Sequence, residues 1–139
     1  MPKYFAYGSN CNPMIMEKKG VAFTSRRRAE LHGYRLLFNK KALRDRLPEA
    51  IGFANINPCP DSSVEGILYD ISSEDLPTLD ASERYPDHYD RIEVTVVSEA
   101  GPETCWAYQA HPDKVAEGLF PSRNCLNQIL SRRDFLSQQ

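Results

Sequence analysis

The sequence predicts an α+β fold in which a mixed, strongly curved sheet or partly closed barrel carries a few short helices. Extended segments recur along the chain, and they do not alternate regularly with helices as in doubly wound α/β proteins. The most regular strand pattern covers residues 91–98, and after a turn around Gly101 the segment 104–108 pairs back as a hairpin. The length of 139 residues is that of one domain, which we expect to span residues 1–139.

Composition and charge argue against several classes of partner. The formal net charge of -2 gives no electrostatic basis for binding nucleic acid or an acidic membrane. The arginine run at 26–28 is short and isolated, and we expect it to form the solvated face of a strand. No apolar stretch reaches membrane-spanning length and no leader pattern precedes the first strand, which predicts a soluble, cytoplasmic protein.

Metal and cofactor signatures are missing from the sequence. The four cysteines are far apart and form no Cys-x-x-Cys pair, so we expect free thiols and no metal site. They are Cys11, Cys59, Cys105 and Cys125. No phosphate loop, dinucleotide fingerprint or Gly-x-Ser-x-Gly elbow occurs, so no cofactor is expected.

The first candidate site feature follows the N-terminal strand. This aromatic segment stops abruptly at Gly8-Ser9-Asn10, and Asn12 and Pro13 then suit the N-cap and first position of a helix. A tight polar loop of this kind can turn several backbone N–H groups toward one point and bind an oxyanion. Gly8 would permit close approach of a ligand. The same triplet is also typical of an ordinary turn.

The middle of the chain predicts one hairpin, in which strands over 28–31 and 34–38 flank His32-Gly33. Further along, the segment 51–57 is followed by a turn cluster at 58–63 and by a strand over 64–71 that has one buried face. Gly66 inside the last of these strands suggests a bulge or a close backbone contact. The basic segment 40–50 is predicted as an exposed loop that could cover a site.

The second candidate site feature is a short helix entered at residues 72–75. Leu76, Leu79, Asp80 and Glu83 share one side of it, which points Glu83 inward or toward a cleft. A partly desolvated carboxyl there could take and return protons near neutrality, although an acid on a helix also commonly faces water. Neither acid has a partner at metal-ligand spacing. A further helix is predicted to open at Pro121.

Taken in order, these motifs resemble those of the γ-glutamylcyclotransferase-like family. The resemblance rests on Tyr-Gly-Ser-Asn at 7–10, Val-x-Gly-x-Leu-Tyr at 64–69 and Asp-Leu-x-x-Leu-Asp-x-x-Glu at 75–83. Tyr89 with the strand after it and Ala107-Tyr108 complete the series, so that the resemblance covers residues 4 to 130.

The resemblance implies a fold, a reaction and a set of site residues. The fold is a small mixed, mostly antiparallel β-barrel with a few short surrounding helices. The reaction is cyclisation of a γ-glutamyl group to 5-oxoproline with release of the attached amine, and it needs no metal or cofactor. Glu83 carries over as the acid–base catalyst. The implied substrate-binding residues are Tyr7, Gly8, Ser9, Asn10, Tyr89 and Tyr108.

Three positions depart from the family pattern and leave alternatives open. Cys11 stands where leucine is common, Arg84 where glycine is common, and Cys125 where a tyrosine is usual. Arg84 is also a candidate ion-pair partner for Glu83. The substrate could therefore be a γ-glutamyl-amino acid, another γ-glutamyl amine such as a γ-glutamyl-lysine remnant, or a γ-glutamylated biosynthetic intermediate. A non-catalytic binding module and a purely structural domain are the remaining readings, and the oligomeric state is left open.

Overall fold

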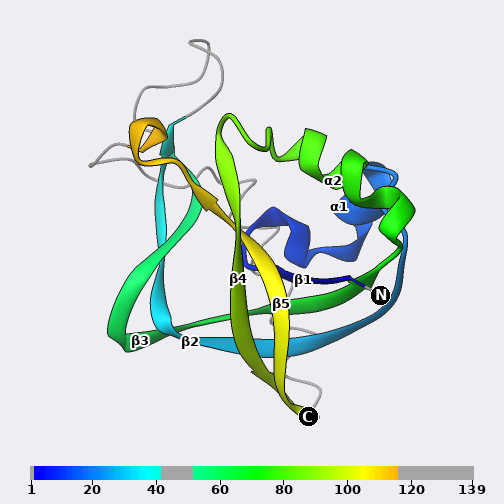
Figure 1. Ribbon diagram of the computed structural model, residues 1–139, viewed down its shortest axis with the longest axis horizontal. Coiled ribbons are helices and arrows are strands. Elements are labelled where there is room, and N and C mark those ends of the chain that lie inside the picture. Colours follow the sequence, from blue (N-terminus) through cyan, green and yellow to red (C-terminus); the bar gives the residue numbers. More distant parts are fainter. Residues whose placement is uncertain (1, 42–51, 116–139) are drawn as a thin grey trace.

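Five strands form a closed barrel in the computed structural model, which describes residues 2–41 and 52–115 (Figure 1). The strands are β1 (Lys3–Ala6), β2 (Phe23–Lys41), β3 (Gly52–Ile71), β4 (Tyr89–Ser98) and β5 (Gly101–Ala110). Their order around the barrel is β1-β3-β2-β4-β5, with antiparallel pairs throughout except for the parallel contact of β1 with β5. The predicted α+β fold with a mixed, mostly antiparallel barrel is thus confirmed.

Short helices accompany the barrel in its described part. They are α1 (Pro13–Lys18), α2 (Leu76–Ser82) and the 3-10 helices Ser9–Cys11, Ser73–Asp75 and Pro112–Lys114. The exposed loop predicted at 40–50 is wrong for its first two residues, because Lys40 and Lys41 end β2 and Lys40 is buried. The rest of that loop, and the helix predicted from Pro121 with Cys125, lie outside the described residues. None of the helices within 2–41 and 52–115 is long and apolar enough to cross a bilayer.

The hairpin predicted at 28–38 and the turn predicted at 58–63 are both wrong, because β2 and β3 are single long strands. They pair antiparallel as one ribbon from Phe23↔Ile71 to Lys41↔Gly52. The register shifts between His32↔Ser63 and Tyr34↔Pro58, so one residue of β2 opposes residues 59–62 of β3. Both clusters of turn-forming residues therefore fall at one irregularity of the ribbon, where the strands continue instead of reversing.

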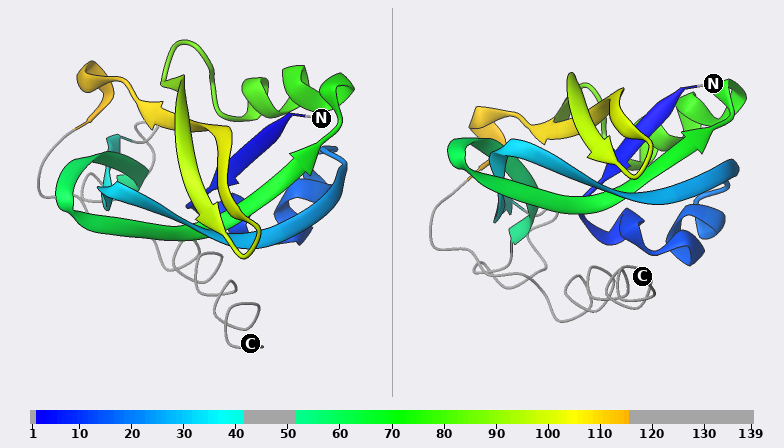
Figure 2. Two further views of the ribbon diagram at one scale, coloured as in Figure 1. Left: turned by 60° about the horizontal axis from the view of Figure 1, so that its bottom comes forward. Right: turned by 90° about the horizontal axis from the view of Figure 1, so that it is seen from below.

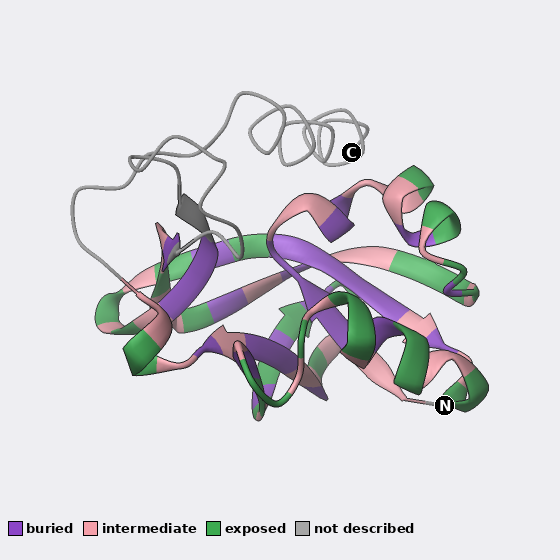
Figure 3. Cartoon of the chain, turned by 90° about the horizontal axis from the view of Figure 1, so that it is seen from above, coloured by how far each residue is buried: buried purple, intermediate pink, exposed green. Residues whose placement is uncertain are grey.

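Two apolar clusters lie on opposite faces of β1, as strand alternation requires. Phe5 and Tyr7 belong to a cluster with members from all five strands. Tyr4 and Ala6 belong to a second cluster, which Met16 of α1 and Leu79 of α2 complete. Figure 2 shows α1 and α2 at the same end of the barrel, and Figure 3 shows how buried positions run along the strands beneath them. The inward phase predicted for Leu79 is confirmed by its complete burial.

Local signals for the two helices were partly correct. The side chain of Asn12 accepts a hydrogen bond from the amide of Met14, and Pro13 occupies the first helical turn, as predicted. Ser72 stands at the entry of the 3-10 helix before α2, but its side chain makes no capping hydrogen bond. Instead, Asp75 accepts from the amide of Ala22 at 2.9 Å, which links the entry of α2 to the start of β2.

The arginine run at 26–28 is not simply a solvated face, because Arg27 forms a part-buried ion-pair network. Its guanidinium donates to both Glu103 carboxylate oxygens and lies 2.9 Å from Asp70 Oδ2. Hydrogen bonds from Arg27, Ser98 and Lys3 hold the pKa of Glu103 well below its usual range, although burial opposes this. The network joins β1, β2, β3 and β5.

Candidate active site

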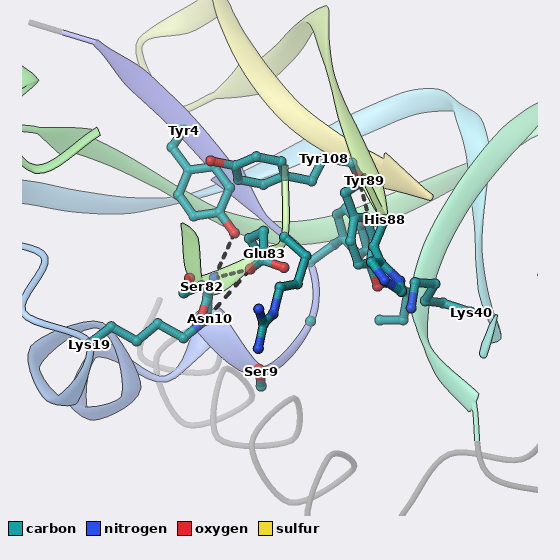
Figure 4. A pocket seen from close by; sticks show the side chains of 14 residues that line it. Tyr4, Ser9, Asn10, Lys19, Lys40, Ser82, Glu83, His88, Tyr89 and Tyr108 are labelled. Carbon is teal, nitrogen blue, oxygen red and sulfur yellow. Dashed lines mark hydrogen bonds and ion pairs between the residues drawn. The ribbon is translucent and has the colours of Figure 1, made fainter. Parts of the chain in front are cut away.

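A cavity of about 210 Å³ lies where the loop after β1 meets the end of α2. All seven residues predicted for the site line it: Tyr7, Gly8, Ser9, Asn10, Glu83, Tyr89 and Tyr108. They come from segments that are far apart in the sequence, and Figure 4 shows Ser9, Asn10, Glu83, Tyr89 and Tyr108 around one space. The volume is below the range typical of drug-sized ligand sites, so the cavity suits a small molecule.

Glu83 lines this cavity next to the N-terminal loop and is held there by two side chains. Asn10 Nδ2 donates to Glu83 Oε1 at 2.7 Å, and Lys19 Nζ lies 3.6 Å from the same oxygen. Lys19 also donates to Asn10 Oδ1 at 2.7 Å, and Asn10 Nδ2 donates to the Tyr4 hydroxyl at 2.9 Å. The Glu83 side chain is 19% exposed, so its carboxylate is partly desolvated and oriented, not freely solvated.

The Gly-Ser-Asn loop after β1 runs into a 3-10 helix over Ser9–Cys11, and its residues Gly8, Ser9 and Asn10 line the cavity. The amides of Cys11 and Asn12 donate to the carbonyls of Gly8 and Ser9, and no described side chain caps this turn. The amide hydrogens of Ser9 and Asn10 therefore have no acceptor among the described residues. The hydroxyl of Tyr69, a residue of β3, donates to the Asn10 carbonyl at 2.7 Å and so fixes the loop to the barrel.

Gly8 has little free space beside it. A Cβ at this position would lie 3.2 Å from the Cβ of Ala54, which is tighter than an ordinary contact. Since Ala54 also lines the cavity, a side chain at position 8 would narrow the space next to the loop.

Buried tyrosines form much of the remaining wall. The Tyr7 hydroxyl donates to the Tyr108 carbonyl, the Tyr108 hydroxyl donates to Asp80 Oδ1 at 2.6 Å, and the Tyr89 hydroxyl donates to the Ala54 carbonyl at 2.8 Å. Burial raises the pKa values of Tyr7 and Tyr108 well above the usual range, so both phenols stay neutral. Asp80 therefore orients the Tyr108 hydroxyl. Arg91 Nε lies 3.8 Å from the same Asp80 Oδ1 atom.

Arg84, a candidate ion-pair partner for Glu83 from sequence, makes no ion pair with Glu83, and both residues lie in the described part of the chain. It is exposed and has a left-handed backbone, with φ of 57°. The Arg84 amide donates to the Ala81 carbonyl and the Tyr85 amide donates to the Asp80 carbonyl, which is the Schellman arrangement at a helix end. That arrangement favours glycine after Glu83, so having arginine instead of the family's common glycine affects the backbone conformation at this position. The cation that pairs with Glu83 is Lys19.

The cavity residues that sequence reasoning missed include two lysines and a histidine, Lys19, Lys40 and His88, besides Tyr4, Ala54 and Ser82. Lys19 follows α1 directly, where a basic residue commonly interacts with the helix end. Lys40 is only 2% exposed at the end of β2, and its Nζ lies 5.7 Å from the centroid of the Tyr89 ring. His88 precedes β4, and its ring Nδ1 is buried without a hydrogen-bond partner among the described residues. No local sequence pattern marks the last two.

The arrangement provides an oriented carboxylate, backbone donors and polar side chains around one small cavity. It therefore suits proton transfer at a ligand whose oxygen is held by amide hydrogens. Across the described ranges, no group of three or more His, Cys, Asp or Glu side chains is placed to hold a metal ion.

Comparison with known families gives a match over most of the chain. A family model described as "Gamma-glutamyl cyclotransferase, AIG2-like" matches residues 4–126. Over 69 residues the chain is 38% identical to the Drosophila melanogaster protein named "Putative gamma-glutamylcyclotransferase CG2811", a match that covers 47% of this chain and 43% of that protein.

Solved structures show the same fold. A protein named "Gamma-glutamyl cyclotransferase" is similar with a TM-score of 0.66 and 27% identity, covering 79% of this chain and 66% of that one. YkqA from Bacillus subtilis is similar with a TM-score of 0.79 and 26% identity, covering 96% of this chain and 48% of that one. The chain thus covers less than two thirds of the length of each of these relatives.

Proposed function

Since the chain belongs to the γ-glutamyl cyclotransferase, AIG2-like family, we propose that it converts γ-glutamyl amines to 5-oxoproline and the free amine. The observation that carries this proposal is the 2.7 Å hydrogen bond from Asn10 to Glu83. It joins the end of α2 to the loop after β1, and the residues on both sides of this hydrogen bond line the same small cavity. No nucleophilic side chain is needed, because the substrate's own α-amine attacks its γ-carbonyl carbon.

Glu83 is the proposed acid–base catalyst. As a carboxylate it accepts a proton from the α-amine, and the amine nitrogen forms a bond to the γ-carbon. The tetrahedral intermediate then collapses by breaking the bond from the γ-carbon to the leaving nitrogen, which takes up the proton from Glu83. The carboxylate is regenerated, so atoms and charge balance over the cycle. Lys19 and Asn10 support this role because both hold Glu83 Oε1 toward the cavity.

The loop after β1 is proposed to stabilise the developing oxyanion. During attack, negative charge gathers on the former γ-carbonyl oxygen, and fixed N–H donors lower the energy of that state. The amides of Ser9 and Asn10 are candidates because they have no acceptor among the described residues. Holding amine and carbonyl in one small cavity also removes much of the orientational part of the barrier.

The test is a 5-oxoproline assay with γ-glutamyl-alanine as substrate. Glu83→Gln keeps the size of the side chain but removes its basicity, so kcat should fall by about 10²–10⁴-fold. Glu17→Gln on the exposed side of α1 is the matched control and should retain full turnover. Product formation by wild-type protein and by Glu83→Gln at equal rates would refute the role of Glu83. Ligand binding without any product would favour the non-catalytic alternative.

The leaving amine is the open part of this proposal. A panel that compares kcat/KM for γ-glutamyl-alanine, a γ-glutamyl-lysine compound and a γ-glutamyl alkylamide distinguishes the substrate classes, because all three share the γ-glutamyl unit and differ only in what departs.

A further inference from the structure

Tyr4 is a cavity residue that the mechanism proposed above does not use. It belongs to β1, is only 4% exposed, and lines the cavity together with Asn10 and Glu83. Figure 4 shows its hydroxyl directed toward Asn10 and Glu83. A buried hydroxyl beside the proposed acid–base residue can act on the same bound molecule, provided that its hydrogen is free to donate.

The hydrogen bonds around Asn10 determine the role of the Tyr4 hydroxyl. A lysine ammonium can only donate, so the Asn10 atom that Lys19 contacts at 2.7 Å is the carbonyl oxygen Oδ1. The amide nitrogen Nδ2 therefore faces the other way, and it donates to Glu83 Oε1 at 2.7 Å and to the Tyr4 hydroxyl at 2.9 Å. Tyr4 is thus the acceptor in this hydrogen bond, and its own O–H hydrogen is left to donate elsewhere.

The O–H hydrogen of Tyr4 finds no acceptor within residues 2–41 and 52–115. Burial and the nearby Glu83 carboxylate raise the pKa of Tyr4 well above its usual range, so the hydroxyl stays protonated and remains a donor. A buried donor without an acceptor costs free energy, and a ligand oxygen in the cavity would remove that cost. The Tyr4 hydroxyl therefore indicates a ligand that presents an acceptor oxygen next to Glu83.

The ring of Tyr4 is held in place by its neighbours. Its centroid lies 5.5 Å from that of Trp106 in a stacked arrangement and 5.5 Å from that of Tyr108 in an edge-on arrangement. Both neighbours belong to β5, which pairs in parallel with β1 at Tyr4↔Trp106. A donor that is fixed before the ligand arrives loses little conformational freedom on binding, so its hydrogen bond contributes more to affinity.

We propose that Tyr4 is a substrate-binding residue whose hydroxyl donates a hydrogen bond to an oxygen of the γ-glutamyl unit. This inference rests on the proposed function for the identity of the substrate. The γ-glutamyl unit is favoured over the departing amine because one amide group, that of Asn10, holds both the Tyr4 hydroxyl and Glu83, and Glu83 must contact the α-amine of that unit. The unit offers carboxylate and carbonyl oxygens as acceptors. Since 5-oxoproline keeps both kinds of oxygen, the same contact holds substrate and product.

Calorimetric titrations in the Glu83→Gln background test this contact without requiring turnover. The ligands are 5-oxoproline and γ-glutamyl-ethylamide, whose departing part carries no carboxylate. Adding Tyr4→Phe keeps the ring and removes only the hydroxyl, and it should weaken binding of both ligands by about tenfold. Because Glu83 is already replaced, an influence of Tyr4 that acted only through the Glu83 carboxylate would be absent from these measurements.

Tyr34→Phe is the matched control. Tyr34 is a half-buried residue of β2 that packs against the apolar cluster of Phe5 and Tyr7, and it does not line the cavity. Loss of its hydroxyl should change the affinity for either ligand by less than about twofold. Melting temperatures of both variants should stay close to that of the parent protein, because phenylalanine keeps the packing of either ring.

A third ligand, 5-oxoprolinamide, identifies the oxygen that accepts. It carries a neutral carboxamide in place of the carboxylate and keeps the ring carbonyl. A loss on Tyr4→Phe that is several-fold smaller for 5-oxoprolinamide than for 5-oxoproline assigns the contact to the carboxylate, since hydrogen bonds to charged groups are the stronger ones. Equal losses for these two ligands assign the contact to the ring carbonyl.

Two results would overturn the proposal. The first is unchanged affinity for 5-oxoproline and γ-glutamyl-ethylamide in folded Tyr4→Phe, and the second is an equal loss of affinity in Tyr34→Phe. Failure of the proposed function would be seen separately, as absence of turnover in wild-type protein that still binds 5-oxoproline in a Tyr4-dependent way.

Discussion

Gly66 packs so closely against β1 that alanine at this position requires the strand to move. An added Cβ would lie 2.3 Å from the Ala6 carbonyl oxygen and 2.7 Å from Phe5 Cζ. Real Cβ atoms do not approach neighbours within 3.0 Å, and here the closest neighbour is backbone. Because β1 pairs with β3 at Ala6↔Ile67, the movement would be transmitted to the loop that starts at Tyr7.

The cost of Gly66→Ala can be worked from three contributions. Overpacking in a well-packed interior costs about 1–3 kcal/mol, and a weakened β1–β3 hydrogen bond adds about 1 kcal/mol. Alanine has less conformational entropy than glycine in the unfolded chain, which offsets this cost by about 0.4–1 kcal/mol. The net loss in free energy of unfolding is about 1–3.5 kcal/mol, which for a chain of 139 residues lowers Tm by about 3–12 °C.

Urea and thermal unfolding followed by circular dichroism measure the loss in free energy of unfolding. The 5-oxoproline assay measures the effect of a displaced loop on kcat/KM. We expect kcat/KM to fall by about tenfold or more, since misplacement by about 1 Å can cost about 10²-fold. Gly33→Ala is the comparison, because its φ of 84° costs about 1 kcal/mol but no atom lies within 4 Å of the added Cβ. It should leave kcat/KM unchanged. A Gly66→Ala protein as stable as wild type would refute the packing argument.

Two further predictions concern stability. Glu103→Gln should lower the free energy of unfolding at pH 7 by about 1–3 kcal/mol, because it removes the charged acceptor of Arg27. Since the folded-state pKa of Glu103 is depressed, the stability that its carboxylate contributes is present above the ordinary value of 4.5 and is lost as pH falls toward the folded-state pKa. Urea titrations of both proteins from pH 7 to pH 3 should therefore converge, and parallel curves would contradict this. Arg84→Gly should raise the free energy of unfolding by about 1 kcal/mol, because glycine adopts the left-handed conformation without strain. A lower urea midpoint would show that the arginine side chain contributes more than its backbone costs.

Local signals predicted the parts of the fold whose cause is local. The N-cap at Asn12, the burial of Leu79 and the β4–β5 hairpin depend on residues a few positions apart, and each is present. The close contact suggested by Gly66 is present as well. The long β2–β3 ribbon was missed because Gly33, with φ of 84°, looks in sequence like the centre of a reversal. Only the pairing partner decides whether such a residue turns the chain or sits in a bulge.

The site could be predicted only in part for the same reason. Glu83 was found because two leucines set the phase of its helix, and the loop was found because glycine and asparagine follow a buried strand. Lys19, Lys40 and His88 reach the cavity through tertiary placement alone. A lysine at a strand end is usually solvated, and nothing in its neighbours distinguishes Lys40 from that common case.

The two edges of β1 are secured to different degrees. Four register pairs attach it to β3, whereas one pair, Tyr4↔Trp106, joins it to β5. The barrel is therefore paired less extensively on the β5 side of the strand that precedes the Gly-Ser-Asn loop. Changes on the β5 side, which contributes Tyr108 to the cavity wall, can thus alter the cavity while the loop stays attached to β3 through β1.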